Sequence, residues 1–381
     1  MSRARAIPPF HVMDLLARAK QLEAEGQSVL HLEVGEPDFA TARPIIDAGI
    51  LALRQLRTHY TAATGLPELR QAIADYYRRR FDISLDPRRV VVTPGASGAL
   101  QLALSVLTEA SDSILLTDPG YPCNRNIAKV LGVNSIDVPV TSQSNYQFHA
   151  SHISEHWQGN TRAAMVASPS NPTGTIIERS VMSDLSAAVR SRGGYLIVDE
   201  IYQGLVYDVD EYTALDLSDD IFVINSFSKY FGMTGWRIGW MVVPESFVDD
   251  VDRVAQNLFL APPTVSQYAA LVAFAPETDE ILQQRVVMFK ERRDYLLPVL
   301  SDLGFKVPVK PQGAFYIYAD CSDITRDSFQ WTRELLEKEG VAVTPGIDFG
   351  EFEANTHVRF AYTRSVDELQ RAMCRIGRFI K

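Results

Sequence analysis

The stretch VVVTPGASGALQLAL, residues 90–104, decides the fold class. Its first four residues have the length and β-branched composition of a buried strand. A turn containing proline and glycine follows, and small and apolar residues then begin a helix. A strand that passes through a tight turn into a helix is the start of a βαβ unit. The stretch therefore predicts an α/β fold.

Five further apolar runs continue this pattern. They occupy residues 114–117, 163–168, 195–200, 222–226 and 238–243. Runs without polar alternation are typical of strands covered on both faces, and segments of helix length separate them. The sequence therefore predicts a mostly parallel sheet between helices.

The two ends of the chain predict a second, smaller α+β domain. Residues 12–25 have apolar side chains at helical spacing, and Gly26 is a natural stop. A long charged helix is predicted over residues 281–300. Shorter strands are predicted within residues 305–320, 341–346 and 357–363. We expect the N-terminal segment to complete this smaller domain.

Composition and charge argue against several classes of protein. The 381 residues carry a formal charge of -10 and no long block of Lys and Arg, so we expect no nucleic-acid partner. No run approaches the roughly 20 apolar residues of a membrane span, and residues 1–26 lack a signal-peptide pattern. The 3 cysteines form no CxxC pair, which favours reduced thiols. We expect a cytoplasmic protein without a membrane partner.

Polar residues follow the predicted strands at the sheet edge where open α/β sheets bind ligands. Gly95, Ala96 and Ser97 offer backbone N–H groups and a hydroxyl at a helix start, which suits either a phosphate or a simple helix cap. Tyr121 follows the next run, as a core aromatic or a ring that stacks on a ligand. Asn171 comes next, in a loop fixed by two prolines.

The later runs end in a carboxylate and an amine. Asp199 ends a very apolar strand, where an unpaired carboxylate is costly, so it needs a buried cation or donor; an arginine or a helix N-terminus is the structural alternative. Lys229 follows the 222–226 run. A lysine becomes a useful nucleophile when desolvation or nearby cations lower its pKa from about 10.4.

These residues, which fall at successive strand ends, together describe a pyridoxal phosphate pocket. The set comprises Gly95, Ala96, Ser97, Tyr121, Asn171, Asp199, Tyr202, Ser226, Ser228, Lys229 and Arg237.

Eight motifs between residues 34 and 362 strengthen this interpretation. They are VGEPDF, HYTAATG, PGASGAL, DPGYP, SPSNPTG, IVDEIY, SFSKYFGMTGWRIGW and VRFAY. The chain resembles the class I and II aminotransferases of the aspartate aminotransferase family, which are pyridoxal phosphate enzymes of fold type I. The resemblance implies a large cofactor-binding domain with a mostly parallel seven-stranded sheet, over residues 46–285. Residues 286–381 would form the small domain, joined by residues 1–45.

The resemblance also implies roles around the cofactor ring. Lys229 would form the Schiff base and then shuttle a proton between Cα and C4′. Asp199 would pair with the pyridinium nitrogen. Asn171 and Tyr202 would hydrogen-bond the phenolic oxygen, and Tyr121 would stack on the ring.

Further cofactor contacts are implied at the phosphate. They are Ala96, Ser97, Ser226 and Arg237, with Tyr60 reaching over from the other subunit of a C2 homodimer. Gly95 and Ser228 are further expected cofactor-binding residues. Ser97 stands where some aspartate-specific bacterial relatives carry a lysine, so the resemblance does not imply a preference for aspartate.

The implied substrate site contains an arginine and a glycine. Arg359 would clamp the α-carboxylate with its planar fork, while Gly35 and Asn171 would line the same site. Family members often have cis bonds before the prolines that match Pro119 and Pro172. Residues 7–10, IPPF, match a stretch that covers the substrate in relatives, so Ile7 and Phe10 either favour an apolar or aromatic substrate side chain or pack against the small domain.

Two weaker signals remain. His149, His152 and His156 would share one face of a helix, but zinc needs three or four converging ligands, and we predict no metal site. Cys123 lies two residues beyond Tyr121, and a small buried apolar role is the expected one.

Three functions follow as hypotheses. The first is transfer of an amino group from an L-amino acid to a 2-oxo acid, with 2-oxoglutarate as the expected acceptor. The second is a pyridoxal phosphate lyase, for example β-elimination on a sulfur amino acid, or cyclisation of an activated one. The third is a transcription regulator with an aminotransferase-like domain, which the acidic charge and the single helix expected before residue 34 disfavour.

Overall fold

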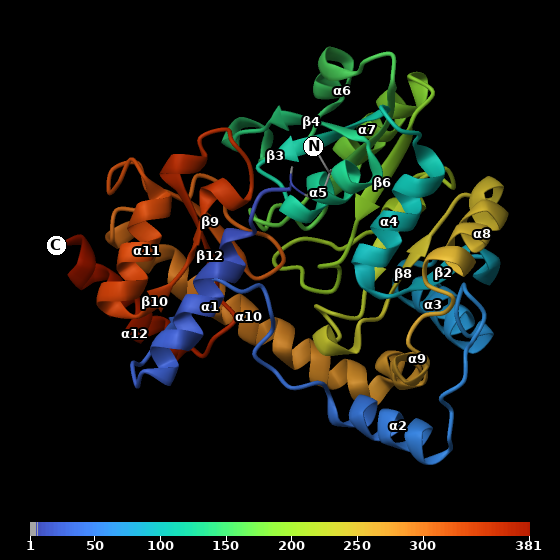
Figure 1. The fold of residues 1–381 in the computed structure, drawn as a ribbon, viewed down its shortest axis with the longest axis horizontal. Coiled ribbons are helices and arrows are strands. Elements are labelled where there is room, and N and C mark those ends of the chain that lie inside the picture. Colours follow the sequence, from blue (N-terminus) through green and yellow to red (C-terminus); the bar gives the residue numbers. More distant parts are fainter. Residues whose placement is uncertain (1–4, 6) are drawn as a thin grey trace.

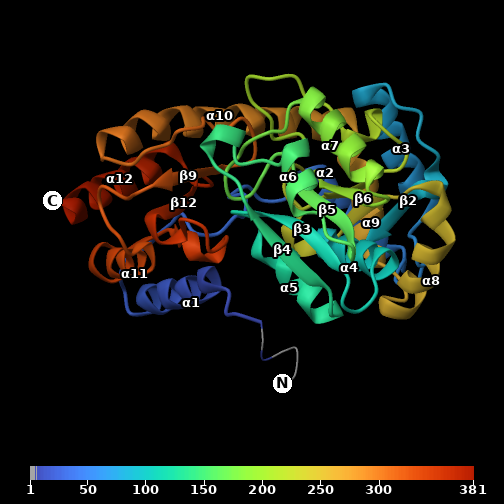
Figure 2. The ribbon, with the colours of Figure 1, turned by 90° about the horizontal axis from the view of Figure 1, so that it is seen from above.

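The computed structural model describes residues 5 and 7–381, and it shows a large sheet among helices beside a smaller sheet (Figures 1 and 2). The large sheet has 7 strands in the order β2-β8-β7-β6-β5-β3-β4, and only β8 runs antiparallel to its neighbours. Its strands are β2 (Val90–Thr93), β3 (Ser113–Asp118), β4 (Asn134–Pro139), β5 (Thr161–Ala167), β6 (Tyr195–Asp199), β7 (Phe222–Ser226) and β8 (Gly239–Val242). The predicted α/β class and mostly parallel sheet are confirmed.

Alternate residues of one strand enter two different cores. Val90 and Val92 of β2 pack in one hydrophobic cluster, whereas Val91 packs in the cluster on the opposite face. Because both faces are buried, these strands show no polar alternation. The helices associated with this sheet are α2 (Arg43–Arg54), α3 (Pro67–Phe81), α4 (Gly95–Leu107), α5 (Pro122–Leu131), α6 (Ala150–His156), α7 (Arg179–Ser191), α8 (Val248–Leu258) and α9 (Thr264–Ala270).

The smaller sheet and the N-terminal segment lie together. The sheet is antiparallel, in the order β11-β12-β9, and β1 pairs in parallel with β10. The apolar face of α1 packs on Leu336 and Ala342. The elements are α1 (His11–Ala24), β1 (Leu30–His31), β9 (Tyr316–Asp320), α11 (Ser328–Glu339), β10 (Val341–Ala342), β11 (Thr344–Pro345), β12 (His357–Ala361) and α12 (Val366–Ile380).

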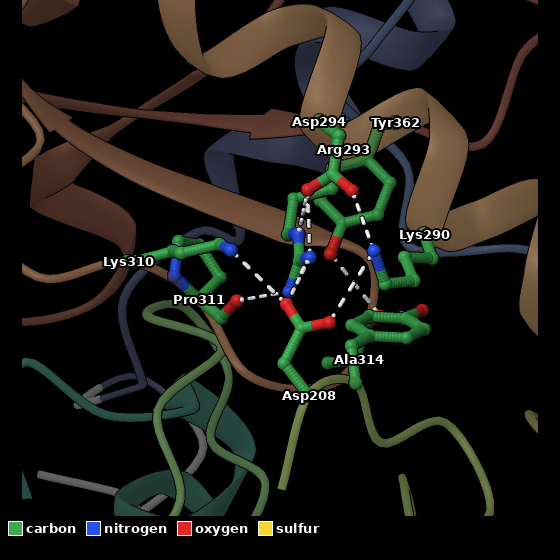
Figure 3. A network of polar contacts seen from close by, with 9 residues as sticks. Asp208, Lys290, Arg293, Asp294, Lys310, Pro311, Ala314 and Tyr362 are labelled. Carbon is green, nitrogen blue, oxygen red and sulfur yellow. Dashed lines mark hydrogen bonds and ion pairs between the residues drawn. The ribbon is translucent and has the colours of Figure 1, made fainter.

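The long helix α10 (Pro276–Asp302) runs along both sheet regions (Figures 1 and 2). Arg293 on α10 is fully buried and donates to Asp208 at 2.6 Å and to the carbonyl oxygen of Pro311 at 2.9 Å (Figure 3). Lys310 also donates to Asp208, and these cations hold the pKa of the Asp208 carboxyl well below its usual range. The cluster therefore ties α10 to the loop after β6 and to the segment that enters β9.

Over the described part of the chain, no helix combines the length and the apolar character needed to cross a membrane.

Candidate active site

A pocket of about 260 Å³ lies where β5, β6 and β7 end, and residues of α1, β9 and β12 contribute to its wall. Most of the predicted site residues line it: Gly35, Ala96, Ser97, Tyr121, Asn171, Asp199, Tyr202, Ser228, Lys229, Arg237 and Arg359. Gly95 and Ser226 do not line it, but they contact the lining residues Arg237 and Ser228 respectively. Tyr60 is 80% exposed on the surface of the chain and does not line the pocket.

Lys229 lies three residues beyond the end of β7 and is half-buried. Its Nζ donates to the carbonyl oxygen of Gly35 at 2.7 Å. Burial lowers the pKa of the Lys229 amine to about 8, with help from the Arg359 and Arg237 cations, although the Glu36 and Asp199 carboxylates oppose the shift. A substantial fraction of this amine is therefore neutral near physiological pH, as a nucleophile or general base requires.

Asp199 is the last residue of β6, the strand beside β7. Its Oδ1 accepts the backbone N–H of Ile201 at 3.0 Å, and burial raises the pKa of the carboxyl to about 6. No ion pair joins Asp199 to a lysine or arginine of residues 5 and 7–381, so the structural alternative of an arginine partner is not realised there. This carboxylate is free to pair with a buried ligand cation.

The start of α4 and the turn after β7 form a corner whose groups suit an anion. Gly95 has φ +72, and a Cβ there would lie 2.5 Å from Nη2 of Arg237, so only glycine lets the guanidinium approach the helix start. Ser226 Oγ accepts the backbone N–H of Ser228 at 3.1 Å and donates to its hydroxyl at 3.0 Å. Gly95 and Ser226 thus shape the corner, while Arg237 and Ser228 face the pocket.

Arg359 on β12 is a buried cation held in one orientation. Its Nη1 donates to Oδ1 of Asn171 at 2.9 Å, and its guanidinium lies 4.3 Å from the ring centroid of Tyr316 and 4.8 Å from that of Phe349. Its buried Nε has no hydrogen-bond partner within the described residues. A fixed planar fork with an unused donor is suited to a carboxylate.

Tyr316 is a site residue that the sequence did not reveal. Its hydroxyl lies 2.8 Å from that of Tyr202, and a Cβ at position 35 would lie 1.8 Å from it. Any side chain at position 35 would therefore collide with the Tyr316 hydroxyl, so this position requires glycine. The sequence marked this part of the chain only as a strand, because the partners Tyr202 and Tyr316 lie 114 residues apart.

The weaker sequence signals have structural explanations. His149 precedes α6, and its backbone N–H donates to Nδ1 of His152 at 3.0 Å, so these two histidines cap a helix. Within the residues described, no three His, Cys, Asp or Glu side chains form a group that could hold a metal. Cys123 lines the pocket, and burial raises the pKa of its thiol. The peptide bonds before Pro119 and Pro172 are cis, as is the bond before Pro169.

Comparisons with known proteins found a matching family model, similar sequences and similar solved structures. The family model for aminotransferase class I and II matches residues 27–376. The chain is 36% identical over 97% of its length to (5-formylfuran-3-yl)methyl phosphate transaminase of Methanocaldococcus jannaschii, covering 96% of that protein. It is 37% identical over 98% of its length to valine--pyruvate aminotransferase of Mycobacterium tuberculosis, covering 97% of it. A crystal structure of an aminotransferase from Mycobacterium tuberculosis superposes with a TM-score of 0.97 at 36% identity, covering 100% of this chain and 98% of that one.

Proposed function

The chain belongs to the class I and II aminotransferases, and we propose that it uses the pocket around Lys229 to bind pyridoxal phosphate and move an amino group from an L-amino acid to a 2-oxo acid. One observation carries the proposal: an amine with a lowered pKa, just beyond the end of β7, and a carboxylate with a raised pKa, at the end of the adjacent strand β6, line the same pocket. Groups with pKa values shifted in this way are typical of functional sites.

The residues present fit pyridoxal phosphate. A dianion suits the corner at the start of α4, where Arg237, Ser228 and backbone N–H groups meet. A protonated ring nitrogen suits Asp199, because it supplies the cation that this buried carboxylate lacks. Tyr121 offers an aromatic face, and Tyr202 and Asn171 offer hydrogen-bonding groups.

The chain's own groups then have defined tasks. Pyridoxal phosphate, when bound, supplies an aldehyde that condenses with amines and a ring that accepts an electron pair from the substrate Cα. Lys229 Nζ would act as the general base that removes the proton from the substrate Cα. Asp199 would pair with the ring nitrogen and favour its protonated form. Arg359, held by Asn171, binds the substrate α-carboxylate, and the Tyr316 hydroxyl orients Tyr202.

A homodimer is the assembly that we propose. Large apolar side chains are exposed on and just after α2 and at the end of α8, and Tyr60 is exposed as well. They are Ile50, Leu51, Leu53, Leu56, Leu258 and Leu260. Thr264 donates to the carbonyl oxygen of His59 at 2.8 Å, which places residues 59 and 264 side by side. Exposed apolar surface of this kind supports an interface with a second copy, to whose pocket Tyr60 would contribute.

We also propose the division into a large domain, residues 46–285, and a small domain, residues 286–381, with residues 1–45 joined to the small one. The pairing of β1 with β10 and the packing of α1 on Leu336 support it.

Transfer of labelled nitrogen tests the function. Protein loaded with pyridoxal phosphate should move ¹⁵N from an L-amino acid into the amino acid that corresponds to an added 2-oxo acid. A lyase would release ammonia and a 2-oxo acid without any acceptor; no observation favours that chemistry here. Ammonia release in multiple turnovers without an acceptor, and no labelled product with one, would contradict the proposal.

A further inference from the structure

One wall of the pocket is apolar, and it comes from α1, α4 and α5. Phe10 and Val12 lie where α1 begins, Leu100 belongs to α4, and Ile127 belongs to α5. The Phe10 ring meets the Tyr121 ring edge-on, with centroids 6.4 Å apart. This wall is therefore in direct contact with the aromatic residue expected beside the cofactor.

The cations of the pocket all have other partners or tasks. Among the residues that the structure describes, only Lys229, Arg237 and Arg359 place a positive side chain in the lining. Arg359 is bound to Asn171, Arg237 lies against Gly95 at the anion corner, and Lys229 is the reacting amine. No lining cation of this chain remains for a second substrate carboxylate.

The rim of the pocket carries an acid instead. Thr234 lines the pocket and donates its hydroxyl to Glu36 at 2.5 Å. A carboxylate at the end of a substrate side chain would lose its water beside an apolar wall and would face this negative charge. The lost hydration and the charge repulsion both disfavour the binding of aspartate, glutamate and 2-oxoglutarate.

On the basis of the proposed function, we infer that this enzyme takes amino donors with uncharged apolar side chains and 2-oxo acid acceptors of the same kind, of the size of pyruvate or the branched-chain 2-oxo acids. Donor and acceptor occupy the same pocket in turn, so one wall selects both. The donor Cα gives up its amino group and leaves as a 2-oxo acid, and the acceptor carbonyl carbon receives that nitrogen. The exchange needs no external oxidant or reductant.

Met13 permits a change of charge in this wall without disturbing the core. It lines the pocket, yet it is 52% exposed on α1. A Met13→Arg substitution adds the missing cation. Ala17 lies one turn further along α1, is exposed and does not line the pocket, so Ala17→Arg is the matched control.

The test uses the protein loaded with pyridoxal phosphate and reads binding as well as turnover. Calorimetry measures the affinity for 2-methylvaline and 2-methylaspartate, which lack the Cα proton and do not turn over. We expect 2-methylvaline to bind on the order of 100-fold more tightly, and valine with pyruvate to exceed glutamate with 2-oxoglutarate in kcat/KM by a similar factor. Met13→Arg should strengthen binding of 2-methylaspartate by about 10-fold, and Ala17→Arg should leave it unchanged.

Two kinds of failure are distinguishable. If nitrogen is transferred but 2-methylaspartate binds as tightly as 2-methylvaline, the inferred selectivity is wrong and the proposed function stands. An equal gain in Ala17→Arg, or no gain in Met13→Arg, shows that this wall does not set the charge preference. If no amino acid passes nitrogen to any acceptor, the proposed function itself is wrong.

Discussion

Lys229 and Asp199 show how burial prepares single residues for chemistry. Burial disfavours charge on both groups, so it lowers the pKa of the amine and raises that of the carboxyl. The two strands that deliver these residues are neighbours in the sheet. The same physical cause thus produces a reactive amine and a carboxylate that gains from a cationic partner.

Asp199→Asn gives a pH-dependent prediction. Because the pKa of Asp199 is about 6 in the folded protein and about 3.8 in an exposed setting, the folded state binds this proton more tightly. Stability is therefore lost as pH rises from 4 to 6, by about 2 to 3 kcal/mol. In cofactor-free protein, Asp199→Asn should be more stable than the wild type at pH 7 by about 1 to 3 kcal/mol, and this gain should vanish near pH 4.

Urea unfolding across this pH range measures the effect. The exposed Asp184 on α7 provides the control Asp184→Asn, which should show no such trend. A destabilised Asp199→Asn protein at pH 7, or a difference that does not change with pH, would contradict the assigned environment.

Much of the site could be predicted from the sequence because its residues follow apolar strands directly. Tyr316 could not, since its role depends on the hydroxyl of Tyr202 and on the space at Gly35. The aromatic residues beside Lys229 in the sequence have a structural role. Phe227 packs against Trp240, with ring centroids 4.8 Å apart, and belongs to the core.

Helix α1 illustrates an element whose stability depends on a distant residue. Its N-cap residue, Phe10, makes no side-chain cap hydrogen bond. The carboxylate of Asp348 provides the cap instead, because it accepts hydrogen bonds from the backbone N–H groups of His11 at 2.9 Å and Val12 at 2.8 Å. A separation of more than 300 residues hides such a cap from sequence patterns, which look for it next to the helix.

Asp348→Asn should loosen this end of α1. An amide keeps one acceptor and presents an NH₂ group to the second N–H, so about 1 to 3 kcal/mol of stability should be lost. Because Phe10 and Val12 line the pocket, KM for apolar donors should rise by about 10-fold, with a smaller change in kcat. Steady-state kinetics measures this. The exposed Asp14 supplies the control Asp14→Asn. An equal rise of KM in Asp14→Asn would show that the loss of the Asp348 cap is not the cause of the rise.

Strand β4 is the strand of the large sheet that no apolar run in the sequence marks. It reads NSIDVP, lies at the edge of the sheet and is largely exposed apart from Val138. An edge strand with polar residues lacks the continuous apolar run that identified the six other strands of this sheet. The other strands, including β2 at the opposite edge, were predictable because apolar cores bury them. Strand β4 was not predictable, because much of it is exposed to water.

The proposed dimer belongs to the molecule as a whole. Leu56 is 74% exposed among the other apolar side chains near α2, so Leu56→Asp should weaken self-association. Val287 on α10 is 56% exposed outside this group, and Val287→Asp is the control. Sedimentation equilibrium should show twice the chain mass for the wild type and for Val287→Asp, and a shift toward the single chain for Leu56→Asp. A monomeric wild type would contradict the dimer.

Lys229→Ala, followed by ¹⁵N transfer from labelled L-valine to pyruvate, tests the proposed mechanism most directly. In the wild type loaded with pyridoxal phosphate, labelled alanine should accumulate over many turnovers. In the variant, the rate should fall by at least about 10²- to 10⁴-fold, because the group that moves the Cα proton is gone, and added ethylamine should restore part of it. A Lys229→Ala protein that transfers nitrogen at the wild-type rate would show that another group does this work and would contradict the assignment of the site.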